Sequence, residues 1–226
     1  MKMTSTNTRT SLENFQFNHT PSYCEENVYF LCKKLCELGV ADADGLDLFV
    51  VFISNEKKQV PLWHQKASAR ADGLIVWDYH VVCIQKKLDG DPHPLVWDLD
   101  SSLPFPSLFT SYISETLRPS FQLSSDYERF FRIVRAPMFL RSFASDRRHM
   151  KDPTGNWIAQ PPVYNPIVAK DGTVHNLNEY MEIHAPSELP IVRINLAASM
   201  FDQKFGVVVS ESQLEEFFVE FTIKHS

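Results

Sequence analysis

The segments LIVWDYHVVCI (residues 74–84) and LVWDL (residues 95–99) decide the fold of this chain. Both are rich in β-branched and aromatic residues, which favour extended strands. The stretch between them includes KKLDGDPHP (residues 86–94), whose Asp, Gly and Pro residues are typical of turns. We therefore predict that the two segments are antiparallel neighbours joined by a hairpin connection.

The predicted hairpin brings a histidine and a carboxylate together. If the turn is centred near Asp89, His80 lies directly opposite Asp98, with the two Cβ atoms about 4.5–5.5 Å apart. A register change of one residue would put the two side chains on opposite faces of the sheet. Taken alone, His80 can be a hydrogen-bonded core histidine and Asp98 a carboxylate that caps a turn. Side by side, they form the kind of pair that orients an imidazole for proton transfer.

Upstream of the hairpin, a helix is predicted to begin at Cys24. The string Ser22-Tyr23-Cys24-Glu25 fits a capping box, in which the first and last side chains each accept a backbone N–H at the helix start. Apolar residues follow at helical spacing, on the same face as the cysteine: Val28, Leu31, Leu35 and Leu38. Cys24 should therefore point into the protein from the first turn of the helix.

The position of Cys24 has two interpretations. A thiol near the positive end of a helix can have its pKa lowered from about 8.5 toward 3.5–7.5, and the thiolate is the nucleophilic form. A buried cysteine can also be only a small hydrophobic residue of the core. The neighbouring His–Asp pair favours the first interpretation, because a nucleophilic cysteine needs a base and a group that orients that base.

The rest of the pattern predicts an α+β arrangement. Strands are expected at residues 46–54, 60–66, 74–86, 94–99 and 130–135, and helices at 106–117, at 124–131 and from residue 210 onward. Residues 151–170 contain four prolines and should form a long ordered loop. One helix, then mostly antiparallel strands, then further helices is typical of a sheet flanked by helices.

The composition indicates one folded domain behind a polar N-terminal segment. We expect residues 1–20 to be disordered and residues 21–226 to form a single domain, because 44% hydrophobic residues suffice for one full core. The four cysteines, at positions 24, 32, 36 and 83, fit neither a disulfide framework nor a zinc-ligand pattern. No metal or organic cofactor is expected.

The same properties bound the location and the partners. No apolar run reaches the length that spans a membrane, and the first residues lack the apolar core of a signal peptide. We expect a protein of the cytoplasm, with the nucleus as a second compartment, that acts as a monomer. The net charge of −6 argues against nucleic acid as the main partner and is compatible with a cationic substrate.

Several longer strings are specific enough to indicate a family. They are SYCEEN (22–27), VFISNE (51–56), VWDYHVV (76–82), DLD (98–100) with LPFP (103–106), FASDR (143–147) with HMK (149–151), and GNW (155–157). In these strings the chain resembles the protein N-terminal glutamine amidohydrolase family. The resemblance covers residues 22–182, with a weaker match at 205–217, and residues 183–198 look like an insertion.

The resemblance implies a papain-like or transglutaminase-like fold with the nucleophile at a helix N-terminus, and a catalytic triad of Cys24, His80 and Asp98. The implied reaction converts an N-terminal glutamine of a protein or peptide to glutamate and releases ammonia, through a thioester on the cysteine. In this family the product enters the N-degron pathway of protein degradation.

Selectivity for a chain terminus requires a group that binds the free α-ammonium. Asp78 is the first candidate, because it lies two residues before His80 and would share its face on a regular strand. Tyr23, Glu25 and Ser145 are further candidates, and Glu25 has a competing role in the capping box. The basic residues of a nearby segment are expected on the solvated surface: Arg147, Arg148 and Lys151.

Two other functional classes stay open on the residues alone. A cysteine endopeptidase or a transglutaminase-like acyl transferase would use the same triad, but it needs an open groove for an extended chain. A non-catalytic binding module would keep the fold and tolerate the loss of Cys24, His80 or Asp98, yet all three residues are present.

Overall fold

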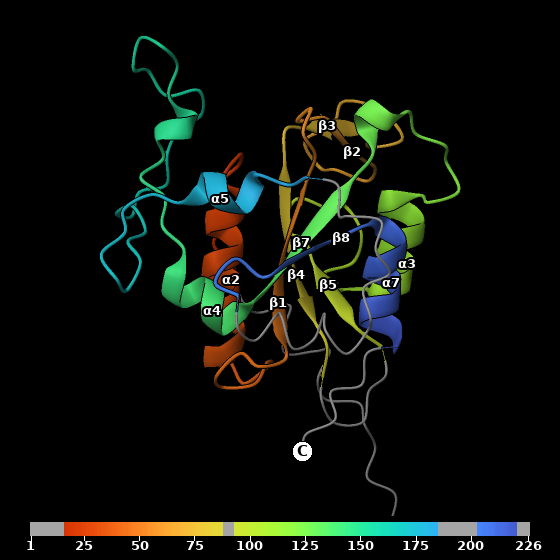
Figure 1. Ribbon diagram of the computed structural model, residues 1–226, viewed down its shortest axis with the longest axis horizontal. Helices are drawn as coiled ribbons and strands as arrows, with labels where there is room; N and C mark the ends of the chain where they lie inside the picture. Colours follow the sequence, from red (N-terminus) through yellow and green to blue (C-terminus); the bar gives the residue numbers. More distant parts are fainter. Residues whose placement is uncertain (1–15, 88–92, 185–202, 221–226) are drawn as a thin grey trace, which may run out of the picture.

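The protein is described here by a computed structural model that covers residues 16–87, 93–184 and 203–220, without the side chains of residues 219 and 220. Its centre is a six-stranded sheet in the order β6 (Ser107–Leu108), β5 (Leu95–Trp97), β4 (His80–Gln85), β1 (Leu48–Ser54), β7 (Phe130–Arg135) and β8 (Val207–Val209). Every neighbouring pair in it is antiparallel. A separate antiparallel pair, β2 (Val60–Leu62) and β3 (Ile75–Trp77), lies near the end of the sheet where β4 begins (Figure 1).

Helices cover both faces of the sheet, as Figure 1 shows. One face carries α2 (Cys24–Glu37), α4 (Ala136–Ser142) and α5 (Leu177–Met181), and the other carries α3 (Phe109–Tyr112), the π-helix η1 (Ile113–Leu117) and α7 (Glu211–Glu220). All seven residues of β1 are buried, because alternate side chains enter the two cores. The observed fold confirms the predicted α+β class, with a mostly antiparallel sheet flanked by helices.

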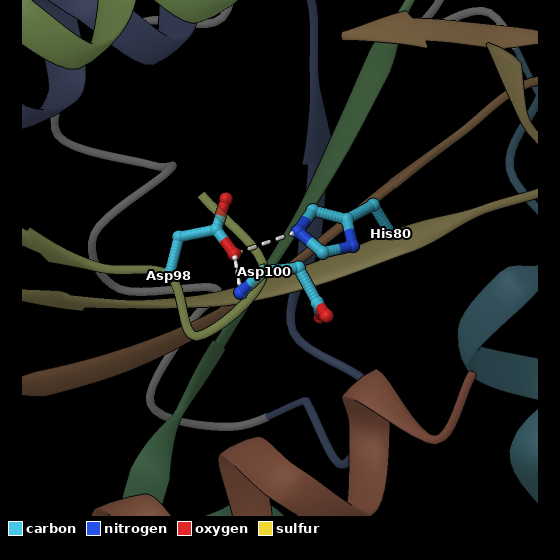
Figure 2. A group of neighbouring side chains, drawn as sticks. All are labelled: His80, Asp98 and Asp100. Atoms are coloured by element: carbon cyan, nitrogen blue, oxygen red, sulfur yellow. Dashed lines mark hydrogen bonds and ion pairs between the residues drawn. The ribbon is translucent and has the colours of Figure 1, made fainter. Parts of the chain in front are cut away.

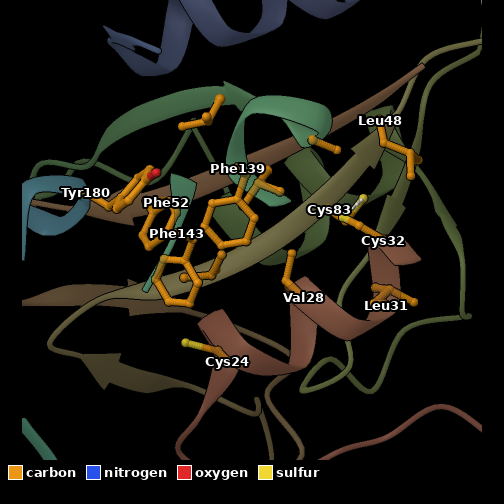
Figure 3. Packing of buried hydrophobic residues seen from close by; sticks show 14 of the residues in the cluster. Cys24, Val28, Leu31, Cys32, Leu48, Phe52, Cys83, Phe139, Phe143 and Tyr180 are labelled. Atoms are coloured by element: carbon orange, nitrogen blue, oxygen red, sulfur yellow. Dashed lines mark hydrogen bonds between the residues drawn. The ribbon is translucent and has the colours of Figure 1, made fainter. Parts of the chain in front are cut away.

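The core on the α2 face is aromatic. Figure 3 shows Phe52 of β1 and Phe139 of α4 packed with Phe143 and Tyr180 above the helix that carries Cys24. The Phe139 and Phe143 rings stack with their centroids 4.6 Å apart, and Phe52 stacks on Tyr180 at 5.1 Å. Rings in such contact add about 0.5–1.5 kcal/mol per pair beyond the area that they bury, so these pairs stabilise the core between α2 and the sheet.

Three predicted elements differ from the structure. The strand predicted at 74–86 is two strands, because the chain bends at Asp78, whose Oδ1 accepts the backbone N–H of Tyr79 at 3.0 Å. The helix predicted at 106–117 starts instead as strand β6, which pairs with β5, and only then turns into α3 and η1. The helix predicted at 124–131 is one 3₁₀ turn, η2 (Ser125–Tyr127), because the β-favouring run FFRIVR enters the sheet as β7.

The hairpin prediction was wrong in its register. Cys83 pairs with Trp97, and the prediction paired it with Leu95. The observed register is shifted by two residues, which keeps every side chain on its predicted face because the side-chain period of a strand is two. His80 and Asp98 are therefore diagonal neighbours and still on the same side of the sheet.

The two predicted helix starts had opposite outcomes. No capping box forms at α2: its N-cap is Tyr23, no side chain caps it, and Ser22 adopts a left-handed backbone with φ of 68°. The helix predicted from residue 210 onward is present as α7, and a capping box does form there: Gln213 Oε1 accepts the backbone N–H of Ser210 at 2.9 Å, and Ser210 Oγ accepts the backbone N–H of Gln213 at 3.4 Å. Helix α2 thus begins at Cys24 without a side-chain cap.

Residues 151–170 contain neither a helix nor a strand and are tied to the body by isolated bridges such as Ser145–Ile167, which agrees with the predicted ordered loop. Most of the predicted disordered segment and most of the predicted insertion lie outside the described residues. Of the first 20 residues, Phe17 packs on Trp97 and His19 Nε2 lies 2.7 Å from Asp100 Oδ1. In the described part of the chain, no helix combines the length and the apolar character needed to cross a membrane.

Candidate active site

A buried histidine–aspartate pair lies at the end of the central sheet. His80 is the first residue of β4, and Asp98 directly follows β5, the neighbouring strand. His80 Nε2 lies 3.0 Å from Asp98 Oδ1, and both side chains are almost completely removed from solvent (Figure 2). The predicted pair is thus present, and it is held by two strands of the rigid sheet.

Hydrogen bonds around Asp98 determine which ring nitrogen of His80 carries the proton. Oδ1 of Asp98 also accepts the backbone N–H of Asp100 at 2.9 Å, and Oδ2 accepts the hydroxyl of Tyr112 at 2.8 Å. An ionised carboxylate only accepts hydrogen bonds, so Nε2 of His80 must be the protonated nitrogen. Nδ1 is buried and has no hydrogen-bond partner among the described residues. Trp77 stacks on the ring at 5.5 Å and 17°, which keeps it in place.

The two groups shift each other's pKa. Burial by itself would lower the pKa of His80, but the Asp98 carboxylate outweighs it and raises the pKa above its ordinary value. Burial would raise the pKa of Asp98, yet His80 and the hydrogen bond from Tyr112 bring it below its ordinary value. The pair therefore stabilises the imidazolium form of His80, so the neutral ring is a stronger base toward a neighbouring acid than a free imidazole.

Cys24 reaches the same end of the sheet from the α2 layer. It is the first residue of α2, and it belongs to the core formed with Val28 and Leu31 further along that helix (Figure 3). The backbone N–H of Val81, the residue after His80, acts to lower the pKa of the thiol, and the sulfur lies 3.8 Å from Oε2 of Glu25. The site therefore joins a thiol from one layer to the His–Asp pair, whose partner Tyr112 belongs to the opposite layer.

The thiol is a weaker acid than its place at a helix start predicts. Burial raises the pKa of Cys24 well above its ordinary value, and the carboxylates of Glu25, Asp100 and Asp78 raise it further. These effects exceed that of the Val81 N–H, which acts in the opposite direction. In this arrangement the sulfur stays a neutral thiol until a base removes its proton.

The two glutamates that follow Cys24 are both fully buried but have different surroundings. Glu26 is held by the guanidinium of Arg147 through two hydrogen bonds of 2.9 Å, which join α2 to the segment after α4. Glu25 accepts the hydroxyl of Tyr79 at 2.8 Å through Oε2. Its second oxygen, Oε1, has no hydrogen-bond partner among the described residues, and burial raises the pKa of Glu25 to about 7.

The other predicted binding residues lie around this centre. Asp78 is exposed, and its negative charge contributes to the raised pKa of Cys24 and of Tyr79. Tyr23 is fully buried, and its hydroxyl donates to the backbone carbonyl of Ala159 at 3.1 Å. Ser145 is fully buried as well, and its Oγ accepts the backbone N–H of residue 147 at 3.3 Å. Asp78 is thus the one of these three with a solvent-facing carboxylate, and the other two hold the loops around the site.

His80, Asp98 and Asp100 could also offer ligand atoms to a metal ion, since one atom from each lies within 4.8 Å of the others. The hydrogen bonds explain this grouping without a metal. Both oxygens of Asp98 already accept hydrogen bonds, and the Asp100 carboxylate pairs with His19 and points away from the His80–Asp98 bond (Figure 2).

Sequence reasoning missed three residues that support the site. Tyr112 donates its hydroxyl to Asp98 and Tyr79 donates its hydroxyl to Glu25, and no local pattern distinguishes these two from core tyrosines. The expectation that Arg147 is solvated was wrong, because its guanidinium is buried against Glu26, 121 residues away in the chain. Arg148 is exposed, as expected. The signal that could have found the pair is the adjacent Glu25-Glu26, because a buried carboxylate needs a partner.

An oriented imidazole can act as the base that activates a nucleophilic cysteine. The chain belongs to the N-terminal glutamine amidase family, whose model matches residues 19–218. A protein N-terminal glutamine amidohydrolase of Arabidopsis thaliana is 62% identical over 205 residues, which cover 91% of this chain and 93% of the relative. Proteins of the same name are 54% identical in Oryza sativa (89% and 87% covered) and 41% identical in Drosophila willistoni (73% and 78% covered).

Proposed function

We propose that this protein hydrolyses the side-chain amide of an N-terminal glutamine in proteins or peptides, giving N-terminal glutamate and ammonia. The observation that carries the proposal is the membership of a family whose plant and fly relatives bear this substrate in their names. We assign the reaction to a triad of Cys24, His80 and Asp98 on a papain-like or transglutaminase-like fold. The geometry around Asp98 supports this assignment, as does Nδ1 of His80, which is left without a hydrogen-bond partner in the described part of the chain.

In the first step, Nδ1 of His80 takes the proton of the Cys24 thiol, and the sulfur attacks the carboxamide carbon of the glutamine. Because burial keeps the thiol neutral, proton transfer accompanies the attack and a stable thiolate does not precede it. Asp98 holds Nε2 and stabilises the imidazolium that forms, without taking the proton itself.

The second step expels ammonia. Preorganised donors stabilise the oxyanion of the tetrahedral intermediate, a contribution of about 3–4 kcal/mol per donor in related chemistry. The backbone N–H of Cys24, at the start of α2, is one such donor. His80 returns the proton to the leaving nitrogen, and a thioester remains on Cys24. Water activated by His80 then attacks the thioester carbon, releases the glutamate side chain and restores the thiol.

Restriction to a chain end needs an acceptor for the α-ammonium, and two carboxylates are placed for it. Asp78 is exposed next to the bend before β4, and Glu25 is buried beside the thiol. Tyr23 and Ser145 contribute through the loops that they hold. We further propose that the protein works as a monomer in the cytoplasm and nucleus, and that its product enters the N-degron pathway.

The test is to incubate the protein with peptides that begin with Gln, Asn or acetyl-Gln, and to measure ammonia. We expect release from the free Gln peptide. Acetylation removes a charge-assisted contact of about 1.5–3 kcal/mol, which lowers catalytic efficiency at least about tenfold. The Asn side chain is one methylene shorter and should not reach the sulfur while its amine stays anchored. Equal release from acetyl-Gln or internal Gln would identify a general glutaminase, and cleavage of the peptide bond would identify an endopeptidase.

A further inference from the structure

Several buried polar atoms near Glu25, the residue after Cys24, have no hydrogen-bond partner among the described residues. They are Oε1 of Glu25 and both ring nitrogens of His149 and His175. Buried polar atoms are hydrogen-bonded in the great majority of cases, so a cluster of such atoms needs an explanation. Nε2 of His149 lies 3.5 Å from Oε1 of Glu25, and the two imidazole rings stack at 6.5 Å. These contacts form a row that runs from Cys24 through Glu25 and His149 to His175, whose Nδ1 lies 3.2 Å from Oδ1 of Asp146.

Among the described residues, no arginine or lysine forms an ion pair with Glu25. The neighbouring Glu26 has the guanidinium of Arg147, whereas Glu25 is met by a tyrosine hydroxyl, the thiol and an imidazole. That imidazole does not supply the charge, since burial and His175 lower the pKa of His149 to about 4. A buried carboxylate without a positive partner is unfavourable unless it is protonated or a ligand brings the charge.

We propose that Oε1 of Glu25 and Nε2 of His149 together receive the α-ammonium group of the substrate's N-terminal glutamine. The inference rests on the proposed function, and it assigns to His149 a role in specificity. An ammonium group has three N–H donors and can donate to a carboxylate oxygen and an imidazole nitrogen at once. Glu25 directly follows Cys24, so an amine bound to Glu25 would lie close to the thiol. The side chain of the same glutamine could then extend to the sulfur.

The titration behaviour of the cluster agrees with this assignment. Because the pKa of His149 is about 4, its ring is neutral near pH 7 and offers a lone pair instead of repelling a cation. Because the pKa of Glu25 is about 7, the empty site holds a proton there for part of the time. An arriving ammonium favours the ionised carboxylate, so binding should release that proton near neutral pH.

Other charged groups around Glu25 bear on this titration. From α2, Glu26 adds negative charge, and Cys24 lies beside it. Tyr79 donates its hydroxyl from the turn before β4, and this hydrogen bond favours the ionised carboxylate. From the other side, Asp146 favours a protonated His149 while His175 opposes it. Each of these groups is present both with and without substrate, so the proton released on binding reports the arrival of the ammonium.

The first test measures proton release directly. Cys24→Ala protein is titrated with a Gln-initiated peptide by calorimetry at pH 7, in buffers that differ in ionisation enthalpy. We expect a fraction of one proton to be released for each peptide bound to the Cys24→Ala protein. We expect no proton release from the double variant that also carries Glu25→Gln. The peptide's own amine has a pKa of about 7.7–8.0 and would take up a proton on binding, so it cannot produce this sign. Proton uptake in both proteins would overturn the proposal.

The second test separates His149 from the catalytic groups. His149→Phe keeps the size of the ring and removes both nitrogens, so KM for the Gln peptide should rise at least about tenfold with kcat nearly unchanged. The matched control, His184→Phe at an exposed site, should leave both constants unchanged. The rate of Cys24 alkylation by iodoacetamide and the melting temperature show whether the site stays intact. His149→Asn is the second variant if the first fails to fold.

The outcomes are distinguishable. An unchanged KM in His149→Phe, or a tenfold rise in KM only in Asp78→Asn, would overturn the receptor and leave the proposed function standing. If the unmodified protein releases no ammonia from any Gln-initiated peptide, the proposed function itself fails, and the receptor fails with it.

Discussion

Replacement of Asp98 by asparagine separates the two roles that this carboxylate has in the proposed mechanism. Oδ1 of Asp98 accepts two N–H groups, Nε2–H of His80 at 3.0 Å and the backbone N–H of Asp100 at 2.9 Å. In Asp98→Asn the amide oxygen must take this position, because an NH₂ group there would face two donors. The amide nitrogen then faces Tyr112, whose hydroxyl can turn to accept. The variant should therefore keep the tautomer of His80 and lose only the negative charge.

The magnitude follows from that loss of charge. Two unit charges about 4 Å apart attract by about 4 kcal/mol at an effective dielectric constant near 20, and a neutral hydrogen bond of about 0.5–1.5 kcal/mol remains. The imidazolium that forms in the first step thus loses about 3 kcal/mol, which lowers kcat about 100- to 200-fold. Loss of the tautomer in a serine triad costs about ten-thousandfold, so the two causes can be told apart. The pKa of His80 should also fall, because Asp98 is what raises it.

The assay is the rate of ammonia release from a Gln-initiated peptide as a function of pH. We expect the reduced kcat together with a displacement of the acid limb of the profile to lower pH, since His80 then titrates lower. Asp100→Asn is the control: it retains the backbone N–H and changes a carboxylate that pairs with His19, so its effect should be below about tenfold. A ten-thousandfold loss in Asp98→Asn would refute the hydrogen-bond assignment. A normal rate would remove Asp98 from the mechanism, and a greater loss in Asp100→Asn would make Asp100 the partner.

Three further outcomes test the site and the fold. Cys24→Ala should abolish ammonia release with the melting temperature nearly unchanged, while Cys32→Ala, further along α2, should remain active; turnover by the first variant contradicts the nucleophile assignment. Arg147→Met should lower the free energy of unfolding in a urea titration by about 3–5 kcal/mol, because Glu26 is left buried without its partner, and a loss below about 1 kcal/mol would mean that water reaches this pair. Gly206→Ala should also be destabilising, because Gly206 has φ of 63° and a Cβ there would overlap a carbonyl oxygen of β7; an unchanged urea midpoint would argue against this packing.

The hairpin shows why part of the site was predictable. Composition placed strands at both segments, and the alternation of side chains put His80 and Asp98 on one side of the sheet. The register was wrong by two residues, because it depends on the turn, yet the pair still meets at 3.0 Å. A histidine and a carboxylate reach each other from diagonal positions as well as from directly opposite ones. To predict that His80 and Asp98 meet, it was therefore sufficient to know that both side chains lie on the same face of the sheet. The exact cross-strand register was not needed.

Contacts between distant segments were not predictable in the same way. The charge of Arg147 and its neighbours indicated a solvated surface, because most arginines are exposed. The structure buries it against Glu26, with further hydrogen bonds to the carbonyls of Pro162 and Tyr164. The adjacent Glu25-Glu26 indicates that a carboxylate needs a partner, but no local pattern identifies Arg147 as that partner. Tyr112 is a similar case, since its role depends on where α3 packs against the sheet.

The failed capping box at Ser22 carries the most functional information. The string S-x-x-E satisfies the local rule for a helix start, yet Ser22 has φ of 68° and Glu25 is withdrawn into the interior, beside Cys24. Both departures are unfavourable locally, since a left-handed serine is strained and a buried carboxylate loses hydration. Local rules that fail at one point of an otherwise consistent fold tend to mark functional sites. The position of Glu25 beside a thiol, with one oxygen unpartnered among the described residues, therefore agrees with the proposal that it binds the substrate amine.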